Sequence, residues 1–245
     1  GDGVQEGAEE CDDGNGVNTD DCIDCVLAKC GDGYVQMDVE KCDDGASNGM
    51  YGFCADDCTG PGPRCGDGVT NGPEDCDDGN QVDEDDCSNE CVAPRYVFVT
   101  AGTFTGNLGG LTGADNTCDI SGDTIDPNAI WVAWLSDGTT PASMRLDNNF
   151  TGYYRLPGMN GAVIAKGWTG LTSGTLLAPI DRTQTGAAVG APLRAWTYTA
   201  QDGAKAPGID NCANWTSGSN KSNGRAGELG PTDKSWTDSL TTDCG

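Results

Sequence analysis

The sequence predicts two regions of different construction, a run of small disulfide-rich repeats over residues 1–95 and a compact, β-rich domain over residues 96–245. Three observations predict this division. Of the 14 cysteines, 11 lie in the first region, whereas all six tryptophans lie in the second. The first region also holds 26 acidic but only four basic residues, so it carries most of the net charge of −26. We therefore expect crosslinks to hold the first region together and side-chain packing to hold the second.

The first region consists of three copies of one pattern, at about residues 1–29, 30–64 and 65–95. In a complete copy, one cysteine precedes Gly-Asp-Gly, a second precedes Asp-Asp-Gly, and a closely spaced pair ends the copy. The first copy lacks the leading cysteine, and the middle copy lacks the aspartate pair that precedes the third cysteine elsewhere. A fixed period of this kind predicts repeated small units.

The cysteines of the repeats are expected to form a disulfide framework. Apolar side chains are too few here for a core, so crosslinks of about 2–4 kcal/mol each must offset the chain entropy. The spacing leaves their pairing open. The glycine-rich and aspartate-rich sequence between the cysteines predicts turns and short strands. The framework comprises Cys11, Cys22, Cys25, Cys30, Cys42, Cys54, Cys58, Cys65, Cys76, Cys87 and Cys91.

Such a framework persists only in an oxidising compartment, which predicts a secreted, extracellular or cell-surface protein. Cys22 and Cys25 form a Cys-x-x-Cys that suits zinc, but the chain has no histidine and the other repeats space this pair differently, which disfavours zinc. The acidic surface excludes nucleic acid as a partner. No stretch approaches the roughly 20 apolar residues that span a bilayer, so no membrane insertion is expected.

The carboxylates between the crosslinks repel one another unless a cation lies among them. Calcium takes six to eight oxygen ligands and binds weak sites at extracellular concentrations, so structural Ca²⁺ is the expected cofactor. The spacing differs from that of an EF-hand. The alternative is that these are solvated acidic loops in which Asp-Gly and Asn-Gly steps form turns. The candidate ligands match position by position, Asp12, Asp13, Asn15, Asn18, Asp20 and Asp21 in repeat 1 with Asp77, Asp78, Asn80, Asp83, Asp85 and Asp86 in repeat 3.

The repeat text resembles a known family. Cys-Gly-Asp-Gly, then Cys-Asp-Asp-Gly-Asn, then Asp-Asp-Cys is similar to the myxococcal cysteine-rich repeats of secreted bacterial proteins, and the similarity covers residues 1–91. This resemblance implies surface or secreted localisation and disulfide bonding, with the repeats as a spacer beside another domain. It implies no catalytic activity.

In the second region, the residue types predict strands at residues 96–100, 130–135, 162–165 and 194–199, and a short helix around residues 114–118. Residues 217–230 are polar and glycine-rich and predict a long loop. The six tryptophans fit a hydrophobic core better than a ligand platform, because each ring buries a large apolar area.

The order of these segments resembles the C-type-lectin-like domain of bacterial surface proteins, particularly the leptospiral lectin-like family. The shared text includes Val-Phe-Val-Thr, Gly-Gly-Leu-Thr-Gly-Ala-Asp before Cys118, and Asn-Cys-x-x-Trp at residues 211–215. The resemblance implies an α+β fold dominated by β-strands and loops, with Cys212 paired to Cys244. It also implies a final strand with a cysteine for Cys118, so we expect the domain to be truncated at its C-terminus. The proline motifs and the Trp-Asn-Asp that hold calcium in sugar-binding relatives are missing.

These features favour a structural or adhesive extracellular protein over an enzyme. Without histidine, the Ser-His-Asp, Cys-His and zinc-protease arrangements are impossible, and no spacing singles out a pair among Asp115, Asp137, Asp181 and Glu228 for glycoside cleavage. We expect the repeats to be a calcium-stiffened spacer and the second region a contact module, in a protein that self-assembles, for example into a filament. The alternative is a lectin that binds surface glycans, with or without calcium.

Overall fold

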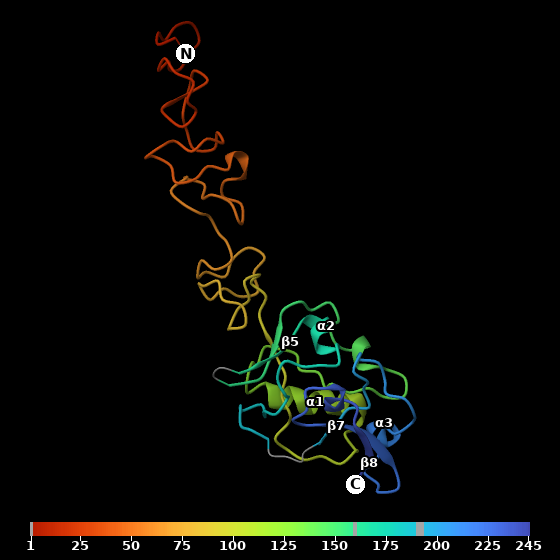
Figure 1. Cartoon of the computed structure of the whole chain (residues 1–245). Coiled ribbons are helices and arrows are strands. Elements are labelled where there is room, and N and C mark those ends of the chain that lie inside the picture. Colours follow the sequence, from red (N-terminus) through yellow and green to blue (C-terminus); the bar gives the residue numbers. More distant parts are fainter. Residues whose placement is uncertain (1, 159–160, 190–193) are drawn as a thin grey trace. The chain divides into compact units, whose positions relative to one another are not determined.

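The computed structural model describes residues 2–158, 161–189 and 194–245. The chain divides into two compact units, Gly1–Val92 and Ala93–Gly245, each drawn in Figure 1. The first is a disulfide-rich region with little regular structure. The second is made mostly of β-sheet with few helices. Among the described residues, no helix has the length and apolar character that a bilayer crossing requires.

The first unit holds two short strands, β1 (Cys22–Ile23) and β2 (Val26–Leu27), and one 3-10 turn, η1 (Gly45–Ser47). Strands β1 and β2 form an antiparallel hairpin, with Cys22 opposite Leu27 and Ile23 opposite Val26. The two turn residues, Asp24 and Cys25, both have positive φ, of 48° and 64°. This is the backbone of a two-residue hairpin turn whose twist matches that of the strands. This turn accommodates the spacing between Cys22 and Cys25, which is one residue shorter than between the corresponding cysteines of the other repeats.

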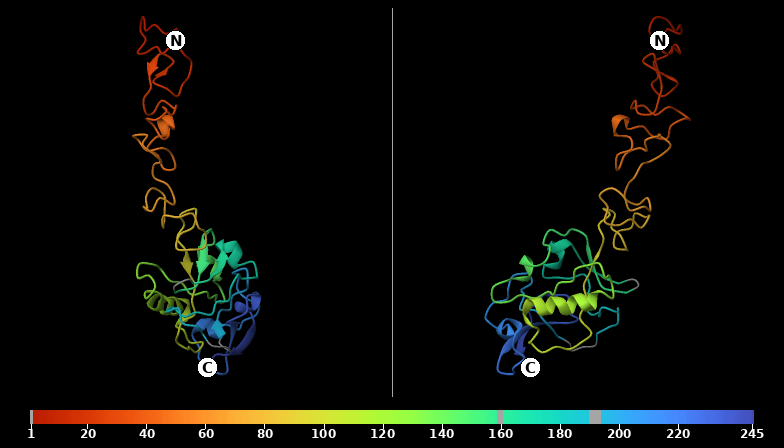
Figure 2. Two further views of the ribbon diagram at one scale, coloured as in Figure 1. Left: turned by 60° about the vertical axis from the view of Figure 1, so that its left-hand side comes forward. Right: turned by 180° about the vertical axis from the view of Figure 1, so that it is seen from behind.

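The second unit contains two three-stranded sheets. In the first, β3 (Arg95–Tyr96) pairs parallel with β4 (Tyr153–Arg155), which pairs antiparallel with β5 (Val163–Lys166). In the second, β7 (Asn223–Glu228) lies between β6 (Arg194–Trp196) and β8 (Leu240–Asp243), and both pairings are antiparallel. The helical elements are α1 (Gly110–Gly122), η2 (Ala142–Met144), α2 (Gly167–Leu171), α3 (Cys212–Trp215) and η3 (Lys234–Trp236). Figure 2 shows this unit from two further sides.

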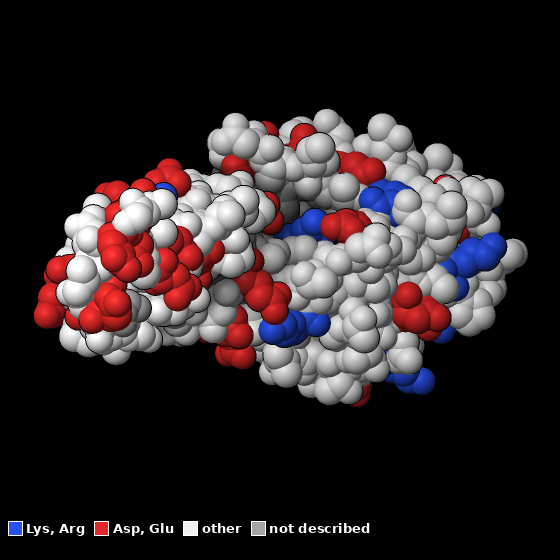
Figure 3. Space-filling model, turned by 90° about the horizontal axis from the view of Figure 1, so that it is seen from above, with Lys and Arg blue, Asp and Glu red and all other residues white. Residues whose placement is uncertain are grey.

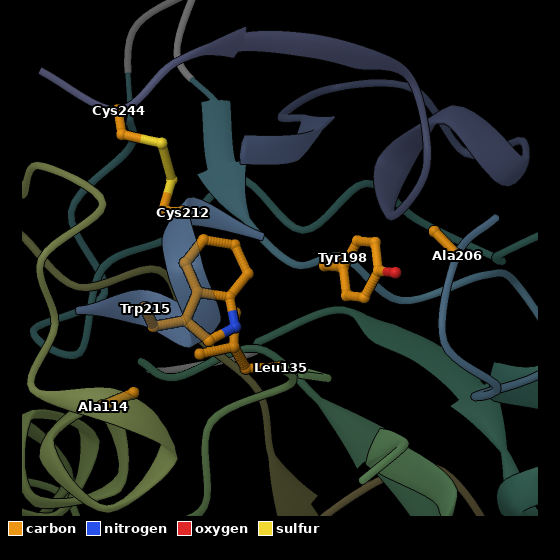
Figure 4. Close-up of a cluster of buried hydrophobic side chains, with 7 residues drawn as sticks. All are labelled: Ala114, Leu135, Tyr198, Ala206, Cys212, Trp215 and Cys244. Atoms are coloured by element: carbon orange, nitrogen blue, oxygen red, sulfur yellow. A yellow bond between two sulfur atoms is a disulfide. The ribbon is translucent and has the colours of Figure 1, made fainter. Parts of the chain in front are cut away.

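The core of the second unit surrounds Trp215. This side chain is fully buried, and in Figure 4 its indole lies between the Cys212–Cys244 disulfide and Leu135. The indole nitrogen donates a hydrogen bond of 2.7 Å to the carbonyl of Ser136. Trp236 is also buried, and the other four tryptophans are partly buried. The rings therefore serve mainly as packing, as the sequence favours.

The α3 turn has an unusual backbone. Cys212, Ala213, Asn214 and Trp215 all have positive φ, between 51° and 63°, so they form one left-handed turn. This conformation costs roughly 1–2 kcal/mol per non-glycine residue. Contacts at both ends hold it, since the disulfide fixes Cys212 and the Asn211 side chain accepts from the Asn214 N–H at 3.0 Å.

The predicted strand at residues 130–135 is not a strand. Its backbone hydrogen bonds go to side chains instead of to a neighbouring strand, since Asp115 on α1 accepts from the Ala133 N–H at 2.9 Å. Arg145 forms an ion pair with Asp115 and also donates to the carbonyls of Ala133 and Leu135. The segment is thus an extended connection clamped onto α1.

The other segments follow the sequence more closely. The predicted helix exists but is longer, as α1, and the predicted strands near residues 163 and 194 correspond to β5 and β6. The first predicted strand shrinks to β3 and an isolated bridge at Val99. The predicted loop at 217–230 contains β7, the central strand of its sheet. The glycines of β7 made this segment look like a loop.

Candidate functional site

The disulfides of the repeats are nested, and each closes within its own repeat. In repeat 2 the Cys30–Cys58 bond encloses Cys42–Cys54, and in repeat 3 the Cys65–Cys91 bond encloses Cys76–Cys87. Repeat 1 has the inner bond, Cys11–Cys22, with a Cα–Cα separation of 5.8 Å. The same Cα–Cα separation, within 0.1 Å, recurs in all five bonds. The three repeats therefore share one covalent design.

Cys25 is an exception to the predicted framework. Within the described residues its sulfur is not bonded to another cysteine. The Cys22 sulfur of the Cys-x-x-Cys is bonded to Cys11, so Cys22 and Cys25 do not form a pair of thiolates.

The first aspartate of each Asp-Asp-Gly ties the two halves of its repeat together. The Asp77 carboxylate accepts four backbone N–H bonds, from Gly66, Asp67, Gly68 and Gly79, at 2.8–3.1 Å. In the other repeats, Asp12 accepts from Asp2, Gly3 and Gly14, and Asp43 from Gly31, Asp32, Gly33 and Gly45. We call Asp12, Asp43 and Asp77 the clamp aspartates.

The clamp favours the charged form of these carboxyl groups. Hydrogen bonds from the backbone N–H groups of Gly3 and Gly14 lower the pKa of Asp12 below its ordinary value. For Asp43 and Asp77, partial desolvation raises the pKa, but the hydrogen bonds, chiefly from Gly45 and Gly79, outweigh it and the net shift is downward. All three clamp aspartates are therefore ionised whenever the fold is intact near neutral pH.

The clamp changes the candidate calcium set. An ionised carboxylate has about four lone-pair sites, and the four N–H donors occupy those of Asp77. The Asp77 carboxylate therefore closes a loop, and its role as a metal ligand stays a prediction. Asp12 accepts three N–H donors and retains part of its capacity.

A second contact pattern repeats in the acidic loops. The Asn15 side chain accepts from the Val17 N–H at 2.6 Å and donates to Asp20 at 3.1 Å. Asn80 makes the same bonds with Val82 and Asp85, at 2.6 and 3.2 Å. The bond from Asn15 lowers the pKa of Asp20. The loops thus have a fixed internal order that keeps several oxygen atoms close together.

In repeat 1 this order surrounds a small polar cavity of about 60 Å³. The structure brings four of the six predicted ligands to it, Asp12, Asp13, Asn15 and Asn18, and adds Asp24, which the sequence comparison missed because repeat 3 has no matching turn. Carboxylate and amide oxygens fit calcium chemistry. Asp20 accepts a hydrogen bond from the side chain of Asn15, which lines the cavity. Asp21 instead accepts a hydrogen bond of 2.7 Å from the side chain of Gln36 in the next repeat.

In repeat 3 the predicted ligands have partners within the loop. Asp78 accepts from the Asn80 N–H, Asp83 from the Asn89 N–H at 2.9 Å, and Asp85 from the Cys87 N–H. Asp86 also has an interaction partner. Asp13 and Asp20 of repeat 1 accept the equivalent bonds from the N–H groups of Asn15 and Cys22, so the two acidic loops share this hydrogen-bond pattern.

The charge of the first unit is exposed to solvent. In Figure 3 acidic groups crowd the repeat unit with scarcely a basic group among them, whereas acidic and basic groups are interspersed over the second unit.

Neighbouring repeats are joined by polar contacts. The Gln36 side chain donates to Asp21, and the Tyr51 hydroxyl donates a hydrogen bond of 2.7 Å to Glu74.

The second unit has a larger, mostly apolar cavity of about 370 Å³. Residues 97–104, one side of α1 and strand β6 line it. Its aromatic lining consists of Phe98, Phe104, Trp134, Trp196 and Trp236. The Cys118 thiol also faces it, and burial raises the pKa of this thiol to about 11. The cavity favours apolar groups, and a sugar hydroxyl would find few partners there.

Comparison with known proteins bears on the repeats. Residues 54–92, which comprise repeat 3 and the end of repeat 2, match a family model described as a domain of unknown function (DUF4215). A stretch of 38 residues is 60% identical to part of the acetylcholinesterase collagenic tail peptide of Torpedo marmorata. That stretch is 16% of this chain and 8% of the Torpedo protein. The family match therefore lies within the cysteine-rich region.

Proposed function

We propose that this chain belongs to a secreted extracellular protein of structural or adhesive function, with Gly1–Val92 as a covalently closed spacer and Ala93–Gly245 as a lectin-like contact module. The observation that carries the proposal is that each described disulfide of this unit lies within one repeat, nested in repeats 2 and 3, and that each repeat has its clamp aspartate. Crosslinked, acidic units with a minimal core suit a segment that separates other parts.

The similarity to the Torpedo marmorata protein supports this proposal, because that protein is named a collagenic tail peptide. Catalysis has no support from the residues present. The chain has no histidine, and the Asp115 carboxylate, one of the acids weighed above, is engaged by Arg145.

The spacer proposal is tested by measuring the distance distribution between two spin labels in the oxidised protein. The labels replace the exposed side chains of Val17 and Val82, and they are attached through residues other than cysteine so that the disulfides stay intact. A narrow distribution that persists in high salt and broadens when the disulfides are reduced is expected. High salt screens the like charges, so persistence would attribute the rigidity to the crosslinks. A broad distribution in the oxidised protein would contradict the proposal.

We further propose that calcium binds at the acidic loop of repeat 1, where Asp12, Asp13, Asn15, Asn18 and Asp24 surround the small polar cavity. Sites of extracellular modules bind calcium with Kd of about 10⁻⁴–10⁻³ M. Calorimetric titration should therefore show weak binding that Asp13→Asn reduces and that Asp75→Asn, an exposed control outside the loop, leaves unchanged. Heat of binding that is absent, or equal in all three proteins, would remove calcium from the proposal.

A second candidate function is glycan binding by the lectin-like unit. The observation that favours it is the Cys212–Cys244 bond, with Trp215 packed against it, which is the bridge that the lectin resemblance implies. A glycan array probed with and without calcium separates the two candidates. Specific retention favours the lectin, whereas ordered self-association without retention, seen by light scattering and electron microscopy, favours the structural protein.

A further inference from the structure

The apolar cavity of the second unit has walls from separate parts of the fold. Residues 97–104 form one side, α1 contributes Ala114, Thr117 and Cys118, and residues of β6 and β7 form another side. Its volume of about 370 Å³ lies within the range of about 300–1,000 Å³ that is usual for ligand pockets. An apolar cavity of about 150 Å³ holds benzene, so this one has room for a molecule of about two rings.

The cavity opens to solvent beside residues 101–104. These residues line the cavity and are exposed, and the Phe104 side chain is 46% exposed. The Trp196 indole N–H donates a hydrogen bond of 3.0 Å to the Phe104 carbonyl, which ties this loop to β6. A molecule from solvent therefore meets an aromatic ring at the entrance and further aromatic rings inside.

Trp236 brings an unsatisfied donor to the cavity wall. Its side chain is only 7% exposed, and among the described residues its indole nitrogen has no acceptor. The ring packs against Trp134, with 5.1 Å between the ring centroids. A buried donor without a partner is costly, and such groups in native proteins are nearly always bonded to the protein, to water or to a bound molecule. The Trp236 N–H thus has hydrogen-bonding capacity to spare.

Other donors of the wall are already used. Trp134 donates a hydrogen bond of 2.7 Å to the Thr237 hydroxyl, and Trp196 donates to the Phe104 carbonyl. The Thr197 hydroxyl donates to the Thr237 carbonyl. A bound molecule therefore meets apolar rings together with the donor that Trp236 leaves unsatisfied. The matching ligand has apolar rings and one acceptor oxygen.

Two opposite charges lie at the same part of the wall. Arg194 in β6 is directly opposite Glu228 in β7, and both residues line the cavity. Directly opposite residues of an antiparallel pair have their Cβ atoms about 4.5–5.5 Å apart on one face of the sheet. An anionic ligand would be attracted by one of these side chains and repelled by the other, and so would a cationic one. This pair of charges favours a neutral ligand.

We propose that this cavity binds a neutral, mostly apolar molecule of about two rings, whose oxygen accepts a hydrogen bond from the Trp236 indole N–H. The rings of the ligand are buried against Phe98, Trp134 and Trp196, and the hydrogen bond sets its orientation. Such a ligand differs from a glycan, whose hydroxyl groups would find few partners in this wall.

The test uses the oxidised chain, labelled with ¹⁵N in its six tryptophan indoles, and three probes that share one ring system. Acetylnaphthalene carries a ketone oxygen, ethylnaphthalene has no acceptor, and naphthoate is anionic. The Kd of each probe is measured from the indole signals. Acetylnaphthalene should bind about three- to tenfold more tightly than ethylnaphthalene, the factor that one neutral hydrogen bond supplies. Naphthoate should bind most weakly, and Trp134, Trp196 and Trp236 should shift most.

Two variants separate the hydrogen bond from the burial of the rings. Trp236→Phe keeps an aromatic ring but removes the N–H, so acetylnaphthalene and ethylnaphthalene should bind it with equal Kd. Trp134→Phe is the matched control. It changes another ring of the wall, whose N–H is used by Thr237, so it should retain the preference for acetylnaphthalene. The indole signal of Trp215, which is buried outside the cavity wall, reports that each variant is folded.

Several results would overturn the proposal. They are the lack of a saturable shift with both neutral probes, equal Kd for these two probes in the unchanged chain, and naphthoate binding as tight as that of acetylnaphthalene. Loss of the preference in Trp134→Phe, or shifts confined to Trp131 and Trp168 outside the wall, would do the same. A water molecule that stays on the Trp236 N–H in the presence of acetylnaphthalene, seen as a water-to-indole NOE, also contradicts it, because the donor is then already satisfied.

Discussion

The Asp77 carboxylate accepts a hydrogen bond of 2.9 Å from the backbone N–H of Gly66, eleven residues earlier in the chain. This contact joins the Gly-Asp-Gly loop of a repeat to its Asp-Asp-Gly turn, and its counterparts at Asp12 and Asp43 join the same parts of the other repeats. The disulfides and these carboxylates hold the same loops in place, so the contribution of one can be measured while the other is kept intact.

Replacing the clamp aspartate should loosen repeat 3 without breaking a disulfide. Asp77→Asn removes the charge and one acceptor oxygen, so two of the four N–H donors lose their partner. Amide hydrogen exchange at Gly66, Asp67 and Gly68 should speed up by tenfold or more. Asp75→Asn, which changes an exposed carboxylate of the same repeat, should leave these rates unchanged. Equal exchange in both variants would mean that the clamp contributes nothing to order.

Acid should weaken the repeats through the same groups. The folded-state pKa values of Asp12, Asp43 and Asp77 lie below the ordinary value of 3.8 for an aspartate side chain. A depressed pKa stabilises the fold fully above the unfolded value, and that stabilisation is lost as pH falls through the folded value. Titration followed by NMR of the glycine amides should therefore show the repeat loops intact at pH 5 and disordering below about pH 4. Loops that persist unchanged in strong acid would exclude a clamp role.

The disulfide of the second unit should contribute to its stability by restricting the unfolded chain. The Cys212–Cys244 bond spans 32 residues, for which the loop-entropy estimate is about 3–4 kcal/mol. The double variant Cys212→Ala and Cys244→Ala should lower the free energy of unfolding of this unit by about that amount, measured in urea. The stability of the repeats serves as the internal reference, because their disulfides do not involve Cys212 or Cys244. An unchanged urea midpoint would show that Trp215 packing alone fixes the α3 turn.

The left-handed α3 turn predicts a stabilising substitution. Ala213 is exposed and has a φ of 55°, a conformation that glycine adopts without steric cost. Ala213→Gly removes a strain of roughly 1–2 kcal/mol and adds a smaller loss of backbone entropy. The variant should thus be more stable by about 0.5–1 kcal/mol in thermal unfolding. Ala101→Gly, at an exposed residue without positive φ, should give no gain, and an equal gain in both would rule out a strained turn.

The repeat pattern could be predicted from the sequence, but the clamp could not. Aligning equivalent cysteines and Asp-Asp-Gly steps gives the number and extent of the repeats, because the spacing itself is the signal. The spacing of residues does not reveal which backbone N–H groups the Asp77 carboxylate accepts from. The sequence therefore treated all the acidic residues of a loop alike, as candidate metal ligands. Asp24 was missed for a similar reason, since only the hairpin of repeat 1 turns it toward the cavity.

In the second unit, glycine and apolar runs misled in opposite directions. Residues 130–135 are apolar enough for a strand, yet the side chains of Asp115 and Arg145 take their backbone hydrogen bonds. Strand β7 looks like a loop because it contains Gly224 and Gly227. A Cβ at Gly227 would lie 1.9 Å from the Trp236 carbonyl oxygen, and one at Gly224 would lie 2.4 Å from the Cys212 sulfur. These glycines permit close approach, which single-sequence reasoning cannot distinguish from flexibility.

No described cystine of the first unit crosses from one repeat into the next. A recombination event in the gene that adds or deletes one such copy would leave every remaining half-cystine with its own mate, so oxidative folding would not be scrambled. The number of copies can thus change in steps of one without breaking a disulfide of a neighbouring repeat, and only the polar contacts between adjacent repeats would have to form anew.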